Sequence, residues 1–273
     1  MAITTGDGYI GASKQLITYV KTASVATLSA IRTTVAQAAG SPGALTLLGA
    51  ATPSGGVPTD ATAGYPTINA FGGGAKGYLT RVLYNSSVAC GLELWDKLYA
   101  VGITTAQLGT LQTLTLSAQP SYSSRIPGGT DYTGLRIFVE ITTTMSATAT
   151  TINVTYTNES GTTGRTTATT SGSLSGFTAG RWIELPLQAG DEGVQKIESV
   201  IIGGATNAAG ALNVIVARRL WRGRVAIVNG SQQDSLDRTG MPEVFADSAL
   251  VLTVQPDSTA TGIPDLALEI ANG

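Results

Sequence analysis

Asp191 and Glu192, which follow Gly190, are the first candidates for chemistry in this sequence. Two carboxylates can act as acid and base in glycoside cleavage when their environments differ and their separation suits the reaction. Adjacent residues on a strand or turn point apart, however, so we interpret residues 189–193 as a hairpin turn. Asp131 lies in a similar polar turn, and no EF-hand spacing indicates a calcium site.

The glycine-rich segment Gly72–Gly77 satisfies the pattern G-x-G-x-x-G, whose glycines can bring backbone close to a pyrophosphate. That site requires a helix after the last glycine. Residues 78–84 instead alternate like a strand, and Lys76 does not complete a Walker A loop. We therefore predict a flexible turn and no phosphate site.

Histidine is absent from the chain, and Cys90 is its only cysteine. The sequence thus lacks the commonest metal ligand and the base of Ser-His and Cys-His nucleophile systems. Cys90 lies in an apolar stretch, where a buried structural role is typical. We expect no catalytic residues, cofactor, metal or small-molecule substrate, and therefore no enzyme.

The dense basic segment at residues 218–224 contains Arg218, Arg219, Arg222 and Arg224 around Trp221. Guanidinium groups bind phosphates and a tryptophan can stack on bases, so DNA contact is one interpretation. The other, which we favour, pairs the arginines with carboxylates of the same sheet or of a neighbouring molecule. Phosphate binding would weaken steeply with salt.

Charged residues make up only 12% of the 273 residues, and the net charge is −2. Such a chain has no global field to attract nucleic acid, which makes nucleic acid an unlikely partner. It also has extensive neutral surface, which a subunit of an assembly would bury. No apolar stretch approaches the ~18 residues that a membrane span needs, and no export signal is evident, so we expect no membrane partner and assembly in a cytoplasm.

Most of the chain alternates apolar and polar residues over short stretches that are separated by glycine, asparagine or proline, which is typical of β-strands. We expect on the order of ten strands in two packed antiparallel sheets, a jelly-roll-like β-sandwich. The strands are predicted at 79–84, 92–99, 111–116, 135–141, 152–156, 182–187, 197–202, 212–216, 250–254 and 266–270, the last two as an antiparallel pair.

The first forty residues differ, because their apolar positions approach a helical spacing from Asp7, a candidate N-cap, to Val35. One or two helices are predicted there, followed by a long loop from Gly40 to Gly77 that lies on a partner or on the protein's own surface. We therefore divide the chain into a helical and extended N-terminal arm (1–77) and an antiparallel β-sandwich domain (78–273). The arm packs either on a neighbouring subunit or across its own sheet, and the candidate interface residues are Tyr9, Leu16, Tyr19, Arg218, Arg219, Trp221 and Arg222.

Several segments give the chain a family resemblance. It resembles tailed-bacteriophage virion structural proteins over roughly residues 78–273, and more loosely at residues 36–43. The segments that carry this resemblance are 78–81, 92–98, 134–140, 154–166, 185–194, 197–200, 247–252 and 266–273. The resemblance implies a virion component of the head and carries no catalytic residues with it.

We therefore expect a capsid decoration (cement) protein that is located on the capsid surface and stabilises the head by bridging subunits. Its expected partners are the major capsid protein and copies of itself, in a homo-oligomer such as a trimer. The alternative is a neck, tail or host-recognition module, for which Tyr122, Tyr132 and Phe177 are the candidate sugar-stacking residues. A glycan hydrolase is a third, disfavoured class.

Overall fold

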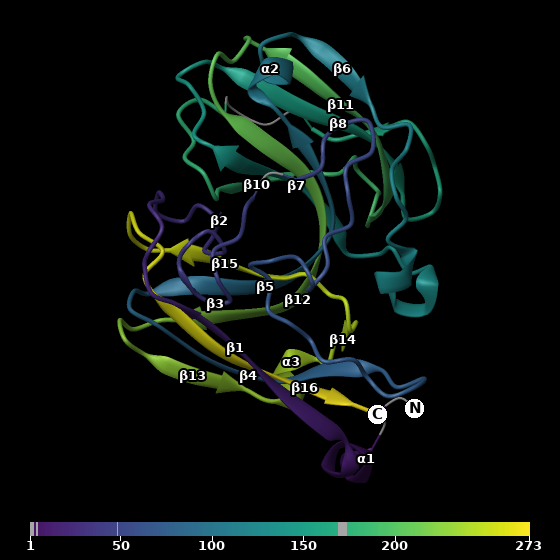
Figure 1. The fold of residues 1–273 in the computed structure, drawn as a ribbon, viewed down its shortest axis with the longest axis vertical. Coiled ribbons are helices and arrows are strands. Elements are labelled where there is room, and N and C mark those ends of the chain that lie inside the picture. The colour runs from purple at the N-terminus through teal and green to yellow at the C-terminus, as the bar shows by residue number, and fades with distance from the viewer. Residues whose placement is uncertain (1–2, 4, 48, 169–173) are drawn as a thin grey trace. The chain divides into compact units, whose positions relative to one another are not determined.

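The computed structural model describes residues 3, 5–47, 49–168 and 174–273 of the chain (Figure 1). The chain forms two compact units. Unit 1 comprises Met1–Thr46, Thr59–Asp96 and Arg219–Gly273, and unit 2 comprises Leu47–Pro58 and Lys97–Arg218. Strands β5 and β12 run from one unit into the other, so the chain passes between the units within regular strands.

The first sheet of unit 1 has the strand order β13-β4-β16-β1-β3, and β14 also pairs with β4. All of its pairings are antiparallel. Its strands are β1 (Ser13–Lys21), β3 (Gly40–Ser41), β4 (Gly77–Ser86), β13 (Ser231–Asp234), β14 (Glu243–Val244) and β16 (Pro264–Asn272).

The second sheet of unit 1 has the order β12-β5-β15-β2. Here β5 and β12 contribute the residues of unit 1, up to Asp96 and from Arg219 respectively. The strands are β2 (Thr33–Thr34), β5 (Cys90–Ile103), β12 (Ala211–Val225) and β15 (Leu250–Pro256). Leucines at alternate positions of β5 and β15, among them Leu92, Leu94, Leu250 and Leu252, join Ile17, Leu266 and Leu268 of the first sheet in one buried core.

Unit 2 also contains two antiparallel sheets. One has the order β10-β7-β12-β5, and the other has the order β6-β11-β8-β9. The strands not yet named are β6 (Gln112–Thr115), β7 (Leu135–Thr143), β8 (Thr150–Asn158), β9 (Arg165–Thr166), β10 (Trp182–Leu185) and β11 (Val194–Gly204). β-Branched residues of β7, β8, β11 and β12, such as Val139, Val154, Val200 and Val214, fill a second core.

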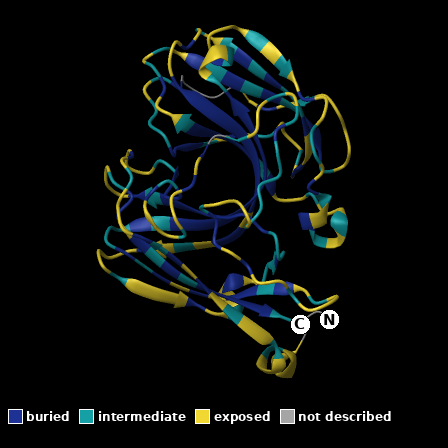
Figure 2. Cartoon of the chain, in the orientation of Figure 1, coloured by how far each residue is buried: buried dark blue, intermediate teal, exposed yellow. Residues whose placement is uncertain are grey.

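The helices of the described chain are short: α1 (Gly6–Gly11), α2 (Thr105–Leu108) and α3 (Leu236–Thr239), with 3-10 turns η1 (Ser123–Arg125) and η2 (Pro127–Gly129). Helix α2 has a full capping box, in which Thr104 and Gln107 satisfy each other's backbone amides. Figure 2 shows buried residues along the central strands and exposed residues on loops and edge strands.

The fold class predicted from sequence is confirmed: the chain is mainly β, with antiparallel sheets that are consistent with a β-sandwich. Each of the ten predicted strands overlaps an observed strand, and the described residues contain sixteen strands in all. The additional strands include β1 and several of only two residues, whose sequences are too short to show a period. The jelly-roll topology stays a prediction.

Three local predictions were wrong. Residues 13–21 form the strand β1, not a helix, because the buried residues Ile17, Tyr19 and Lys21 alternate with less buried neighbours. Helix α1 is capped by the side chain of Thr5, which accepts a hydrogen bond from the Gly8 amide at 3.0 Å, and not by Asp7. Strands β15 and β16 do not pair with each other, because β15 pairs with β5 and β2 while β16 pairs with β1 and β4.

Both compact units take residues from each side of the predicted boundary between residues 77 and 78. The segment 40–77 has little regular structure, as expected, but it buries Leu45, Leu47, Tyr65 and Ile68. Residues 1, 2, 4 and 48 of the predicted arm lie outside the described residues. Whether residues 1–77 also bridge to another molecule stays a prediction.

Candidate interaction surface

Asp191, the first candidate acid or base, is enclosed by hydrogen-bond donors. Arg165 donates from Nε to Oδ2 at 2.8 Å and from Nη2 to Oδ1 at 2.9 Å, and Tyr156 and Asn158 donate at 2.6 and 2.9 Å. The hydrogen bonds from Arg165 lower the pKa of Asp191 to about 2. Asp191 therefore links the turn at residues 189–190 to β8 and β9.

The glycine-rich segment is a turn that leads into β4, as predicted. Lys76 forms an ion pair with Glu243 at 3.0 Å, and the ring of Phe71 lies against the Cα of Gly77. The ammonium group is thus already neutralised, and no helix follows to bind an anion. The described part of the chain contains no group of His, Cys, Asp and Glu side chains that could hold a metal ion. Cys90 is buried, as predicted, and burial raises the pKa of its thiol.

The basic segment lies on β12, and its side chains divide between the surface and the interior. Arg219, Arg222 and Arg224 are exposed, whereas Arg218 and Trp221 are buried. The Trp221 ring packs edge-on against Tyr84 with ring centroids 4.7 Å apart, and its Nε1 donates to Asp234 at 2.9 Å. The Trp221 ring is therefore not available to stack on a base.

The exposed arginines of this segment pair with carboxylates, as the favoured interpretation predicts. Arg224 pairs with Asp257 at 3.1 Å. Arg219 and Arg222 approach Glu93 of β5 at 3.6 and 3.9 Å, and Arg32 donates from Nε to the same carboxylate at 2.7 Å. Three guanidinium groups thus lie within 4 Å of one buried carboxylate.

The three N-terminal candidates occupy different environments. The Tyr9 hydroxyl donates to Glu269 at 2.8 Å, a bond that raises the pKa of Tyr9. Tyr19 is fully buried in the core of unit 1. Leu16, by contrast, is 63% exposed. Of these three residues, only Leu16 presents an apolar side chain to the surface.

Leu16 belongs to the solvent-facing side of the first sheet, which we call the outer face. Register pairs across the sheet place side chains on the same face. Thr18 pairs with Ala267, which pairs with Leu83. Leu16 lies in the next row opposite Glu269, which pairs with Arg81. Leu83 is 44% exposed, so the outer face combines exposed leucines with small residues and one ion pair, Arg81–Glu269 at 2.8 Å.

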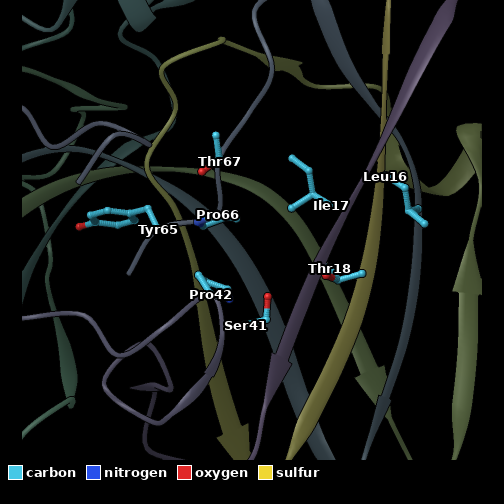
Figure 3. Close-up of a pocket in the computed structure, with 8 residues that line it drawn as sticks. All are labelled: Leu16, Ile17, Thr18, Ser41, Pro42, Tyr65, Pro66 and Thr67. Atoms are coloured by element: carbon cyan, nitrogen blue, oxygen red, sulfur yellow. The ribbon is translucent and has the colours of Figure 1, made fainter. Parts of the chain in front are cut away.

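A hollow of about 290 Å³ borders this face beside β1 (Figure 3). It is lined by Leu16, Ile17 and Thr18 of β1, by Ser41 and Pro42, and by Tyr65, Pro66 and Thr67. β3 pairs with β1 only at Val20 and Lys21, so the edge of β1 beyond them borders the hollow. The Thr22 amide donates to the Ala39 carbonyl at 2.9 Å, so the backbone groups of Thr22 point toward this edge. Backbone groups of alternate residues in a strand point to the same side, and those of Leu16 and Thr18 therefore also face this edge.

Sequence analysis missed two buried polar groups. The Lys21 ammonium donates to four backbone oxygens, those of Ala36, Ala38, Pro42 and Gly43, at 2.8–3.3 Å. Burial lowers its pKa to about 8. In unit 2, the Glu140 carboxylate accepts hydrogen bonds from Lys97, Trp182 and Asn213 at 2.6–2.9 Å. In the sequence, Lys21 and Glu140 could be noticed only as charged residues at core-facing positions of a strand.

The residues of the sugar-stacking alternative are not a set of exposed rings. Tyr122 is buried, and its hydroxyl donates to the Val194 carbonyl at 3.2 Å. Tyr132 packs edge-on against Tyr122 with ring centroids 6.3 Å apart, and Phe177 packs under Arg181. Tyr122 belongs to the core of unit 2, and the partly buried Tyr132 and Phe177 pack against that core.

Among the described residues, no helix is long and apolar enough to cross a membrane.

No protein-family model and no curated protein matches this chain. Among solved structures, the VP2 subviral particle of infectious bursal disease virus is similar at 11% identity and a TM-score of 0.22, covering 96% of this chain and 80% of the other. The Gx strain of that virus gives 10% identity, a TM-score of 0.21 and the same coverage. Its T=1 particles give 11% identity and a TM-score of 0.18, covering 95% and 76%. TM-scores this low do not indicate a common fold.

Proposed function

We propose that this protein is a structural component of a tailed-phage virion, a capsid decoration protein that stabilises the head by bridging capsid subunits. The observation that carries the proposal is the outer face of the first sheet, where Leu16 and Leu83 are exposed on paired strands. The assignment to a phage head comes from the sequence resemblance of residues 78–273. Asp191, Lys76 and the exposed arginines of β12 take part in ion pairs within the chain, which suits a protein that acts through its surfaces.

In this proposal the outer face packs on the major capsid protein, and copies of the chain associate in a homo-oligomer. Binding through a regular sheet costs little backbone conformational entropy, because the strands are already ordered. Several such contacts, repeated around a symmetric assembly, give firm attachment from weak individual interfaces.

Co-sedimentation with purified capsid shells tests the proposal. Purified protein is mixed with shells that lack decoration, and in parallel with bacterial envelopes, and the bound amount is measured over a range of protein concentrations. Saturable retention on shells at a fixed number of copies per capsid subunit supports decoration. Retention on envelopes alone would replace this function with host recognition, and retention on neither would exclude both.

Image reconstruction of intact phage particles would locate this chain on the virion. Density for this chain between capsid subunits supports the proposal. Density at the neck or at the tail tip would overturn it in favour of the alternative virion locations.

A further inference from the structure

The three guanidinium groups around Glu93 leave a local excess of positive charge. Arg32, Arg219 and Arg222 all lie within 2.7–3.9 Å of one carboxylate, which can neutralise only one of them. The Glu93 side chain is 3% exposed, whereas those of Arg219 and Arg222 are 51% and 63% exposed. Two positive charges therefore remain at the surface of unit 1, beside a buried negative charge.

The three arginines are not equivalent. Arg32 is fixed, because its Nε donates to Glu93 Oε2 at 2.7 Å and its guanidinium group lies over the Trp95 ring at 5.4 Å. Arg219 and Arg222 only approach Glu93 Oε1, at 3.6 and 3.9 Å, distances too long for hydrogen bonds. Among the described residues, neither guanidinium group has a hydrogen-bond acceptor, so the N–H groups of both are available to a ligand.

Both of these guanidinium groups lie within 3.9 Å of the same oxygen of Glu93. Like charges repel at such separations, and a buried carboxylate between them offsets that repulsion. Two adjacent guanidinium forks match the planar oxygens of a carboxylate, which they can bind with paired hydrogen bonds. The pair is thus organised before a ligand arrives.

We propose that Arg219 and Arg222, positioned by Glu93, form a receptor for a carboxylate side chain in an acidic segment of the partner protein. This deepens the proposed function, on which it rests for the identity of the partner. Nucleic acid fits less well, because the chain carries a net charge of −2 and the neighbouring Trp221 is buried and bonded to Asp234.

The test compares two double variants. R219Q/R222Q removes the receptor. R224Q/R238Q is the matched control: it removes two equally exposed charges of unit 1, each from a pair with a single aspartate, Asp257 at 3.1 Å and Asp234 at 3.4 Å. Thermal melting first establishes that both variants are folded, which is expected because all four side chains are exposed.

The probes are a fluorescent hexaglutamate peptide and a fluorescent DNA duplex, measured by anisotropy at several salt concentrations. We expect the peptide to bind the natural protein in a salt-sensitive way, R219Q/R222Q to lose about tenfold in affinity, and the control to stay within about twofold. Equal peptide affinity in the two variants would overturn the proposal. DNA binding that is stronger than peptide binding and is lost only in R219Q/R222Q would replace it with a phosphate receptor.

Shell co-sedimentation separates this inference from the proposed function. If the natural protein binds shells and R219Q/R222Q binds them equally well with the same salt dependence, the receptor is wrong and decoration stands. If the peptide result holds but no variant binds shells, decoration is wrong and the receptor stands.

Discussion

At the scale of single residues, Asp191 shows how a candidate catalytic group becomes a structural one. Its carboxylate accepts four hydrogen bonds, two of them from Arg165, and its pKa is lowered to about 2. Ionised Asp191 therefore stabilises the folded state above its ordinary pKa, and this contribution is lost as the pH falls through the folded value. The turn was predictable from local sequence, but the partner arginine lies 26 residues away.

We predict that D191N lowers the free energy of unfolding by about 1–3 kcal/mol at neutral pH, because the bonds to a charged acceptor are lost. The difference from the natural protein should shrink as the pH falls from about 4 to about 2, since both chains then carry a neutral group. Urea unfolding at a series of pH values measures this. E192Q is the matched control in the same loop, and an equal effect of E192Q would contradict the assignment.

Glu140 and Lys97 give a second prediction at this scale. Both side chains are buried, and their ion pair is 2.8 Å long. E140Q leaves the Lys97 ammonium buried without a counter-charge, and we expect it to cost about 3–5 kcal/mol of stability. K97M/E140Q should recover most of that loss, because it removes both charges and keeps an oxygen for Trp182 and Asn213. Urea unfolding of the natural protein, K97M, E140Q and K97M/E140Q measures the coupling, and additive losses would show that the pair is not coupled.

At the scale of elements, β1 is the strand that local pattern misassigned. It pairs with β16 along eight residues but with β3 only at Val20 and Lys21. The amides of Ile17 and Tyr19 therefore face β16, while those of Leu16 and Thr18 face the open edge beside the hollow.

We predict an alternation in amide hydrogen exchange along β1. Ile17 and Tyr19 should exchange slowly, whereas Leu16 and Thr18 should exchange at least about tenfold faster, because only the first pair donates within the sheet. Exchange measured by NMR reads each amide separately. Uniform protection from Leu16 to Tyr19 in the isolated protein would contradict the open edge. Protection of Leu16 and Thr18 that appears only on self-association would identify that edge as a contact between copies.

At the scale of the whole molecule, the proposed function depends on what the outer face contacts. L16S/L83S removes its two exposed leucines and should leave thermal stability nearly unchanged, since surface substitutions have small effects. We expect it to weaken attachment to capsid shells by roughly 10–100-fold, the effect of losing about 1.5–3 kcal/mol of apolar burial.

L111S is the control for this experiment, because Leu111 is 53% exposed but belongs to unit 2 and not to the outer face. It should bind shells like the natural protein in the same co-sedimentation assay. If L111S and L16S/L83S weaken attachment equally, the outer face is not the contact surface. If neither weakens it, the attachment depends on other residues.

The sequence by itself determined the class of this protein, because alternation of apolar and polar residues is a local property: a strand such as β8 follows from alternating residues within the strand. It also indicated the turns within residues 72–77 and 189–193, where glycine and polar residues act locally. The second turn does not close the predicted hairpin, because β10 pairs with β7 while β11 pairs with β6 and β8. Pairing was a different matter. That β15 lies beside β5 and not beside β16, and that β1 is a strand of the first sheet, depend on the burial of side chains against distant segments.

Only the tertiary structure decided which residues belong together at a site. Residue types suggested that the basic segment would form ion pairs with carboxylates, and it does. The gathering of Arg32, Arg219 and Arg222 on Glu93 could not be foreseen, since these residues come from three separate parts of the chain. For the same reason the sequence could not tell that Trp221 is buried while Leu16 is exposed. Local pattern sets the face of a strand, but packing against other strands decides which face meets water.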